Sequence, residues 1–156
     1  MENLIAFIRL VVAIFCALYI FQTCSAGASE VSPKILHAVN KAADKYNFDP
    51  NLILAIIEVE SNFNVKALGK AGEIGLMQLH PRYFSNIPQG IVGNIDMGVK
   101  YLAYTRKHCS HKNGIEFVTC YNRGTKRKLS KPKLTPYYRK VVNAYYKRFL
   151  AGAINL

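Results

Sequence analysis

Residues 49–64 read DPNLILAIIEVESNFN, and this stretch decides the fold. Asp49 followed by Pro50 is a typical helix start, because aspartate caps free backbone N–H groups and proline suits the first helical position. The predicted helix, which ends near Ser61, is apolar nearly all round and should therefore run through the core rather than along the surface. Its last turn contains Glu60, an acidic residue that closes a buried helix.

Glu60 is in an unfavourable place for a negative charge. Burial favours the protonated form of a carboxyl group, and the negative end of the helix dipole acts in the same direction. A glutamate in such surroundings can remain an acid near neutral pH, as the cleavage of a glycosidic bond requires. The sequence also fits an ordinary surface glutamate at a frayed helix end, so Glu60 alone does not decide its own role.

Residues 1–28 have the pattern of a signal peptide. Arg9 precedes an apolar run, and the small residues 26–28 fit an A-x-A cleavage site that would leave a mature domain over 29–156. An uncleaved anchor is the alternative, because Glu2 offsets Arg9 and weakens the basic region. We expect an exported protein, periplasmic or secreted, whose membrane contact is transient and made through this segment.

The chain is strongly basic, with 21 Lys and Arg against 9 Asp and Glu and a formal net charge of +12. Removing residues 1–28 takes away one residue of each sign and leaves this charge unchanged. Such an excess suits nucleic acid, cell-wall polymer or lipid head groups. The expected export argues against intracellular nucleic acid, and the charges form no recognised nucleic-acid-reading helix. The basic stretch 123–133 is either a solvated loop or a polymer contact.

Two cysteines, Cys109 and Cys120, remain in the expected mature chain. In an oxidising compartment this pair predicts one disulfide with a short loop. Free thiols are one alternative, and a zinc site that uses His108 and His111 is another. The spacing matches no common zinc pattern, so we expect no metal, and we expect no cofactor.

The rest of the mature chain predicts an all-α domain with one irregular loop insertion. Ser32-Pro33 repeats the start signal and opens a helix through about Tyr46. Three further helices are expected, over residues 94–107 with Asn94 as the cap, over 114–121, and over 135–150. The stretch 69–88 is rich in Gly and Pro and predicts a loop, with a short helical turn or strand pairing around 76–79.

Five short motifs follow one another in order along the chain. They are Glu60-Ser61-x-Phe63-Asn64, Gly72-x-x-Gly75-Leu76-Met77-Gln78-Leu79-x-Pro81, Asn94-Ile95-x-x-Gly98-x-x-Tyr101-Leu102, Tyr121-Asn122-x-Gly124 and Tyr138-x-x-Val141. The series resembles the catalytic domain of soluble-type lytic transglycosylases (SLT), relatives of goose-type lysozyme, over roughly residues 33–146. The resemblance implies a single helical, lysozyme-like domain with a substrate cleft.

The resemblance also implies an activity. Enzymes of this family cleave the β-1,4 bond between N-acetylmuramic acid and N-acetylglucosamine in peptidoglycan and leave a 1,6-anhydro-muramoyl end. Carried over, Glu60 is the single catalytic acid and base. Substrate contacts are implied for Ser61, Met77, Gln78, Tyr121, Asn122 and Tyr138. Structural roles are open for each of them, as core filler for Met77 and as loop ties for the two amides.

The acidic residues provide an independent test of the mechanism. Ordinary glycoside hydrolases use two carboxylates that flank the bond. Glu58 lies about 200° around the helix from Glu60, so the two cannot face one point of a cleft. Glu73 alone is loosely placed near that cleft. We therefore expect a lytic transglycosylase, with a hydrolytic muramidase as the runner-up and an inactive wall-binding or envelope-assembly module as the non-enzyme alternative.

Several positions depart from the family pattern. Gly69 stands where a serine is common, which puts one substrate contact in doubt, and Glu73 occupies a position that is normally small. Cys120 and Arg123 replace alanines, and a disulfide at Cys120 would brace the floor of the site. A small exported enzyme of this kind suits local opening of the wall for a secretion or conjugation apparatus or a phage, and we expect a monomer.

Overall fold

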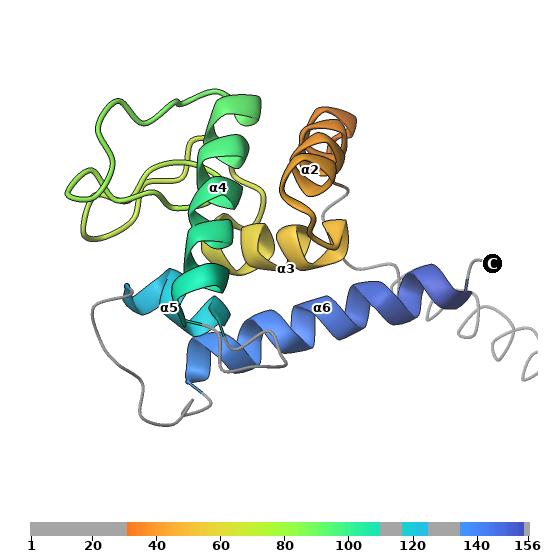
Figure 1. Cartoon of the computed structure of the whole chain (residues 1–156). Helices are drawn as coiled ribbons and strands as arrows, with labels where there is room; N and C mark the ends of the chain where they lie inside the picture. The colour runs from red at the N-terminus through yellow and green to blue at the C-terminus, as the bar shows by residue number, and fades with distance from the viewer. Residues whose placement is uncertain (1–30, 110–116, 125–134, 155–156) are drawn as a thin grey trace, which may run out of the picture. The chain divides into compact units, whose positions relative to one another are not determined.

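The structure is a computed structural model that describes residues 31–109, 117–124 and 135–154. These residues form five helices (Figure 1), namely α2 (Pro33–Tyr46), α3 (Pro50–Ser61), α4 (Ile91–Cys109), α5 (Phe117–Arg123) and α6 (Pro136–Ile154). The expected all-α domain is confirmed over this part of the chain. The segment 1–28, which is predicted to be a signal peptide or anchor, and most of the basic stretch 123–133 lie outside the described residues.

The helix that carries Glu60 begins and ends where local chemistry predicts. At its start, Asp49 Oδ1 accepts a hydrogen bond of 2.8 Å from the backbone N–H of Asn51. At its end, Asn62 adopts the left-handed conformation with φ 48°, which asparagine tolerates better than most residues. Asn47 ends α2 in the same way, with φ 54°. The cap at Asn62 therefore fixes the last turn of α3.

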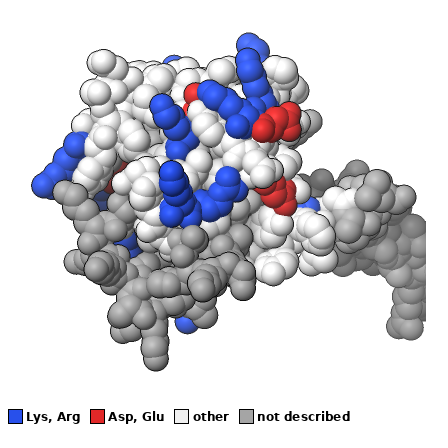
Figure 2. Space-filling model, in the orientation of Figure 1, with Lys and Arg blue, Asp and Glu red and all other residues white. Residues whose placement is uncertain are grey.

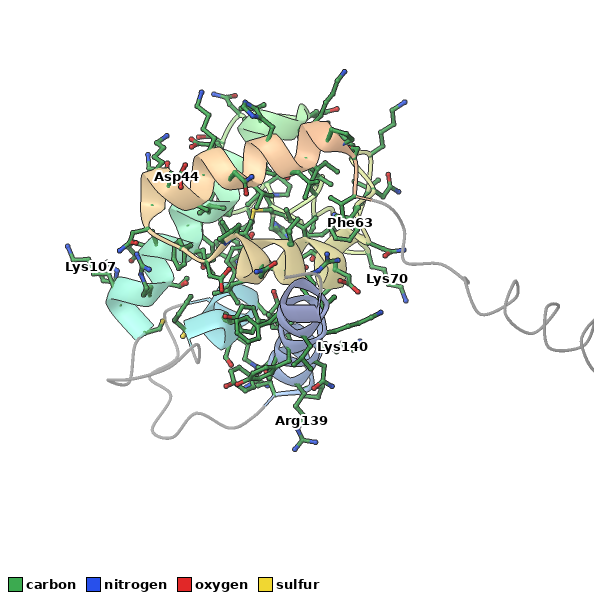
Figure 3. The ribbon with its side chains drawn as sticks, turned by 90° about the vertical axis from the view of Figure 1, so that its right-hand side faces the viewer. Asp44, Phe63, Lys70, Lys107, Arg139 and Lys140 are labelled. Carbon is green, nitrogen blue, oxygen red and sulfur yellow. The ribbon has the colours of Figure 1, made fainter. Side chains whose placement is uncertain are left out.

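The central helix of the domain is α3. Its residues Leu52–Ile57 are each at most 7 % exposed, all round the helix, as its apolar sequence predicts. The helices α2 and α6 pack against it, and Figure 3 shows α3 between them. The helix α4 packs against α2 and α5. The helix α3 is therefore held between α2 and α6.

The irregular segment 62–90 lies beside α4 (Figure 1) and contains a small paired turn. The N–H of Ile74 donates to the carbonyl of Leu79 at 2.9 Å, and the N–H of Leu79 donates back at 3.1 Å. Ile74 also forms an isolated bridge with Leu68. The strand pairing predicted near 76–79 is thus present, as isolated bridges rather than as a strand.

Asn94 does not cap a helix, contrary to the prediction, because α4 already begins at Ile91. Its side chain is buried instead, at 1 % exposure. The amide Nδ2 donates to the carbonyls of Ile74 and Pro88 at 3.1 and 3.2 Å, and Oδ1 accepts from the N–H of Met77 at 2.9 Å. A buried amide requires such partners, so this one residue ties the segment 62–90 to α4.

Two motif glycines permit this close packing. A Cβ atom at Gly75, where φ is 79°, would lie 2.5 Å from Nδ2 of Asn94. A Cβ atom at Gly98 would lie 2.4 Å from the sulfur of Met77. Any larger residue at these positions would separate the segment from α4, and the glycine spacing therefore reflects the packing of this segment on α4.

One face of the described domain is basic. Lys and Arg side chains outnumber Asp and Glu on the face shown in Figure 2. Among the described residues, no helix combines the length and the apolar character that crossing a bilayer requires.

Candidate active site

Glu60 lies in the last turn of α3 and is half-buried. Burial raises the pKa of Glu60 to about 7, a hydrogen bond from Tyr137 acts against this rise, and the negative charge of Glu73 adds to it. The unfavourable electrostatic position predicted from the sequence is therefore present. A carboxyl group that titrates near neutral pH can give up a proton and take one back under the same conditions.

Glu60 lines a pocket of about 590 Å³. Its walls are formed by the end of α3, the segment 69–84, α4 and the end of α5. Its polar and charged lining consists of Glu60, Lys70, Glu73, Gln78, His80, Asn122 and Arg123, and its aromatic lining of Tyr83, Phe84, Tyr101, Tyr104 and Tyr121. This combination suits a ligand that has flat apolar faces and polar edges.

Tyr137 is the functional residue that the sequence analysis missed. Its hydroxyl, in the first turn of α6, donates to Glu60 Oε1 at 2.7 Å. The adjacent Tyr138, for which the family resemblance implies a substrate contact, does not line the pocket, and its backbone N–H donates to Thr135 Oγ1 at 3.1 Å. Two consecutive tyrosines look equivalent in a sequence. The orientation of α6 against α3 decides that Tyr137, rather than Tyr138, donates to Glu60.

Three of the predicted contact residues, Gln78, Tyr121 and Asn122, line the pocket. Gln78 adopts a left-handed backbone with φ 46°, and its Nε2 donates to the carbonyl of Gly75 at 2.9 Å. Its amide therefore holds the turn, while the residue also lines the pocket, and the substrate contact of Gln78 stays a prediction. Asn122 is exposed at the end of α5.

Tyr121, Met77 and Ser61 serve mainly as structural supports. Tyr121 lines the pocket but is 8 % exposed, and its hydroxyl donates to the carbonyl of Met77 at 2.8 Å. Met77 is fully buried beneath Gly98 and does not line the pocket, so its side chain is core filler. The hydroxyl of Ser61 donates to the carbonyl of Ile57 at 3.1 Å, one turn back in α3, and Ser61 does not line the pocket.

An aromatic wall on α4 was not predicted from the sequence. Tyr101 and Tyr104 stack with ring centroids 6.1 Å apart, and Phe84 meets Tyr101 edge-on at 5.2 Å. Tyr83 is 72 % exposed and Tyr104 is 47 % exposed, so both rings are accessible to a ligand. The available signal was the spacing of three residues, which places Tyr101 and Tyr104 on one helix face.

Cys109 and Cys120 are free thiols in the structure. Burial raises the pKa of Cys120 to about 12, and a hydrogen bond with Cys109 adds to the rise, so the two residues are neighbours. The disulfide between them stays a prediction. Within the described residues no three potential metal ligands come together, and His111 of the alternative zinc site lies outside this part of the chain.

Glu58 points away from the pocket, as predicted from its position on the helix. It forms an ion pair with Arg148 of α6 and lies in a separate surface hollow with Lys140 and Lys147. Glu60 and Glu73 are therefore the carboxylates that line the active-site pocket among the described residues.

Comparisons with known proteins agree with this geometry. A family model described as Transglycosylase SLT domain matches residues 37–140. The membrane-bound lytic murein transglycosylase C of Actinobacillus pleuropneumoniae serotype 5b (strain L20) is 40% identical over 101 residues, an alignment that covers 52% of this chain and 27% of that protein. The corresponding protein of Haemophilus ducreyi (strain 35000HP / ATCC 700724) is 34% identical over 114 residues, with 58% and 30% covered.

The chain thus spans less than a third of the length of these curated relatives. The family match runs from α2 into α6 and takes in Glu60, Tyr137 and every described residue that lines the pocket. This protein therefore belongs to the transglycosylase SLT domain family.

Proposed function

We propose that this protein is a peptidoglycan lytic transglycosylase in which Glu60 is the catalytic acid and base. The observation that carries the proposal is a glutamate with a pKa of about 7 inside a pocket of polar and aromatic residues. At neutral pH both forms of this carboxyl group are populated, as a residue that must donate and then accept a proton requires.

In the first step, protonated Glu60 donates its proton to the glycosidic oxygen between the muramoyl and glucosaminyl residues. The bond from that oxygen to the muramoyl anomeric carbon breaks, and positive charge develops on the sugar. Glu60 is now a carboxylate, and the hydroxyl of Tyr137, 2.7 Å from its Oε1, stabilises this form. The tyrosine therefore supports the base stage of the reaction.

In the second step, the Glu60 carboxylate takes the proton of the muramoyl C6 hydroxyl. The oxygen of that hydroxyl attacks the anomeric carbon and forms the 1,6-anhydro ring, and Glu60 is protonated again without consumption of water. Such an internal attack depends on a fixed sugar orientation. The exposed rings of Tyr83 and Tyr104 suit sugar faces, and Gln78 and Asn122 suit N-acetyl and hydroxyl groups.

The test is the mass spectrum of peptidoglycan digested with the purified protein. We expect muropeptides with 1,6-anhydro-muramoyl ends from the wild type and none from Glu60→Gln. Glu58→Gln is the matched control, because it removes the same charge from the same helix turn on the opposite side, and it should give the wild-type products. Equal digestion by Glu60→Gln and the wild type would refute the assignment of Glu60.

A hydrolytic muramidase is the second candidate, and the presence of Glu73 in the same pocket favours it. Muropeptides with a reducing-end muramic acid would identify it in the same spectrum. A wall-binding module without activity would instead retain peptidoglycan while the wild type and Glu60→Gln release nothing.

We further propose that residues 1–28 direct export and that the domain over 29–156 acts on the wall as a monomer. The basic surface, the expected signal sequence and the wall substrate support this placement. Local opening of the wall for a secretion or conjugation apparatus or a phage remains the expected use. The mass of the protein isolated from the envelope fraction tests processing, because cleavage after Ala28 and an uncleaved anchor differ by 28 residues.

A further inference from the structure

Glu73 is a fixed part of the pocket wall. Its Oε2 accepts a hydrogen bond of 3.1 Å from the backbone N–H of Ala71, and its backbone carbonyl accepts one of 2.8 Å from the N–H of Gly69. The residue is half-buried and lines the same pocket as Glu60. The turn thus holds the Glu73 carboxylate inside the pocket.

The space that Glu73 occupies is available only because residue 69 is glycine. A Cβ atom at Gly69 would lie 2.1 Å from Glu73 Oε2 and 2.7 Å from Gln78 Oε1. Both distances are far below a normal contact, so any side chain at 69 would displace the Glu73 carboxylate. The two departures from the family pattern, at 69 and at 73, therefore form one structural unit in which a carboxylate replaces a side chain at residue 69.

Several groups face Glu60 from the surrounding elements. Tyr137 on α6 donates a hydrogen bond to it. Tyr121 on α5 lies close enough for the charge of Glu60 to raise the pKa of its hydroxyl. Glu73, from the segment 62–90, adds a negative charge. Lys70, His80 and Arg123 also line this pocket. Burial, Tyr137 and Glu73 are the causes of the shift in the pKa of Glu60. Glu73 is thus the charged residue that raises the pKa of Glu60.

We propose that Glu73 is a positioning residue of this active site, whose carboxylate, seated against Gly69, acts through Glu60 to keep the catalytic proton in place at neutral pH. The proposal rests on the proposed function for its meaning, because the proton is useful only to an acid catalyst. Glu73 has no other part in the reaction described above. Its effect is to extend the working range of Glu60 to higher pH.

The first test measures the titration of Glu60 directly and does not depend on activity. The side-chain carboxyl carbon of Glu60, assigned by its absence in Glu60→Gln, is followed by NMR against pH in the wild type and in Glu73→Gln. We expect the midpoint to move to lower pH by roughly 0.5 in Glu73→Gln, about a threefold change in the ionisation constant. An unchanged or raised midpoint would overturn the proposal.

Asp44→Asn is the matched control for net charge. Asp44 is exposed on α2 and points away from the domain in Figure 3. It should leave the Glu60 midpoint and the pH–rate profile as in the wild type. If Asp44→Asn moves the midpoint as far as Glu73→Gln does, the effect is one of total charge and the proposal fails.

A second variant, Gly69→Ala, displaces the Glu73 carboxylate without removing it. The atoms that it would clash with most are the flexible ends of Glu73 and Gln78, so the fold can adjust. We expect the Glu60 midpoint to fall as in Glu73→Gln, and the double variant Gly69→Ala with Glu73→Gln to fall no further. A midpoint in Gly69→Ala equal to that of the wild type would contradict the seating of Glu73 against residue 69.

Activity separates the two hypotheses. If the wild type digests peptidoglycan and Glu73→Gln loses activity at lower pH than the wild type does, both the proposed function and the role of Glu73 are supported. If the NMR midpoint moves while the wild type releases no product, the proposed function fails and the electrostatic role of Glu73 stands. If the enzyme is active and both measurements are unchanged in Glu73→Gln, the inference alone fails.

Discussion

Glu58 and Glu60 lie on one helical turn, and the domain places them in opposite surroundings. Glu58 meets the positive charge of Arg148, and their side chains are 30% and 22% exposed. Glu60 meets a neutral hydroxyl, that of Tyr137, inside the pocket. The difference teaches that the side of the helix, rather than the residue type, makes one glutamate a structural ion and the other an acid.

The catalytic rate should separate the two residues most strongly. In the proposed mechanism Glu60→Gln removes the group that donates and accepts the proton, and we expect kcat on purified peptidoglycan to fall by about 10²- to 10⁴-fold. Glu58→Gln should change kcat by less than about threefold, as an altered surface ion pair remote from the chemistry implies. The measurement is the rate of muropeptide release at fixed pH. A comparable loss of rate in both variants would show that the comparison is wrong.

The free energy of unfolding should change in opposite directions in the two variants, with a gain in Glu60→Gln above pH 7 and a loss in Glu58→Gln. The pKa of Glu60 is raised to about 7 from 4.5. The contribution of protonated Glu60 to folding stability is therefore fully present below pH 4.5 and is lost as pH rises through 7. Glu60→Gln does not ionise, and above pH 7 we expect it to be more stable than the wild type by up to about 3 kcal/mol. At pH 4 the difference should vanish. Urea unfolding at pH 4 and pH 8 measures both values, and a variant less stable than the wild type at pH 8 would contradict the expectation.

Tyr137→Phe should sharpen the contrast, because it removes the hydrogen-bond donor that, among the described residues, favours ionised Glu60. A hydrogen bond to a charged group contributes about 1.5–3 kcal/mol, so the pKa of Glu60 should rise further, by roughly 1. The alkaline limb of the pH–rate profile then moves to higher pH, opposite to the shift expected for Glu73→Gln. Tyr138→Phe is the neighbouring control, and a shift there instead would reassign the contact.

The smallest effect is expected from loss of the ion pair between Glu58 and Arg148. Glu58→Gln leaves Arg148 without its carboxylate partner, and for this half-exposed pair we expect a loss of about 1 kcal/mol in the free energy of unfolding. Denaturant unfolding of the variant and of Arg148→Gln measures it. A loss well above 2 kcal/mol would mean that the pair behaves as a buried one.

Much of the fold was predictable because it depends on short-range signals. The pairs Ser32-Pro33 and Asp49-Pro50 started helices where expected, and the all-round apolar sequence of α3 predicted its central position. Asn94 was misjudged because the same residue type serves as a cap and as a buried amide. Only the packing of the segment 62–90 on α4, which is a long-range property, distinguishes the two roles.

The site was predictable to the same extent. Glu60, Gln78 and Asn122 stand in local motifs, and the structure places them in one pocket. Tyr137 and the space at Gly69 could not be derived in this way, because both depend on how distant segments meet. The contact from Tyr137 to Glu60 joins residues 77 positions apart in the sequence.

That last contact has a consequence for the timing of activity. The helix α6 covers α3 and delivers the tyrosine, so a nascent chain folded only as far as α5 would expose its acid to water. A carboxyl group in water ionises near pH 4.5 and has no proton to give at neutral pH. Under the proposed function, the proton donor would therefore form only when α6 docks on α3.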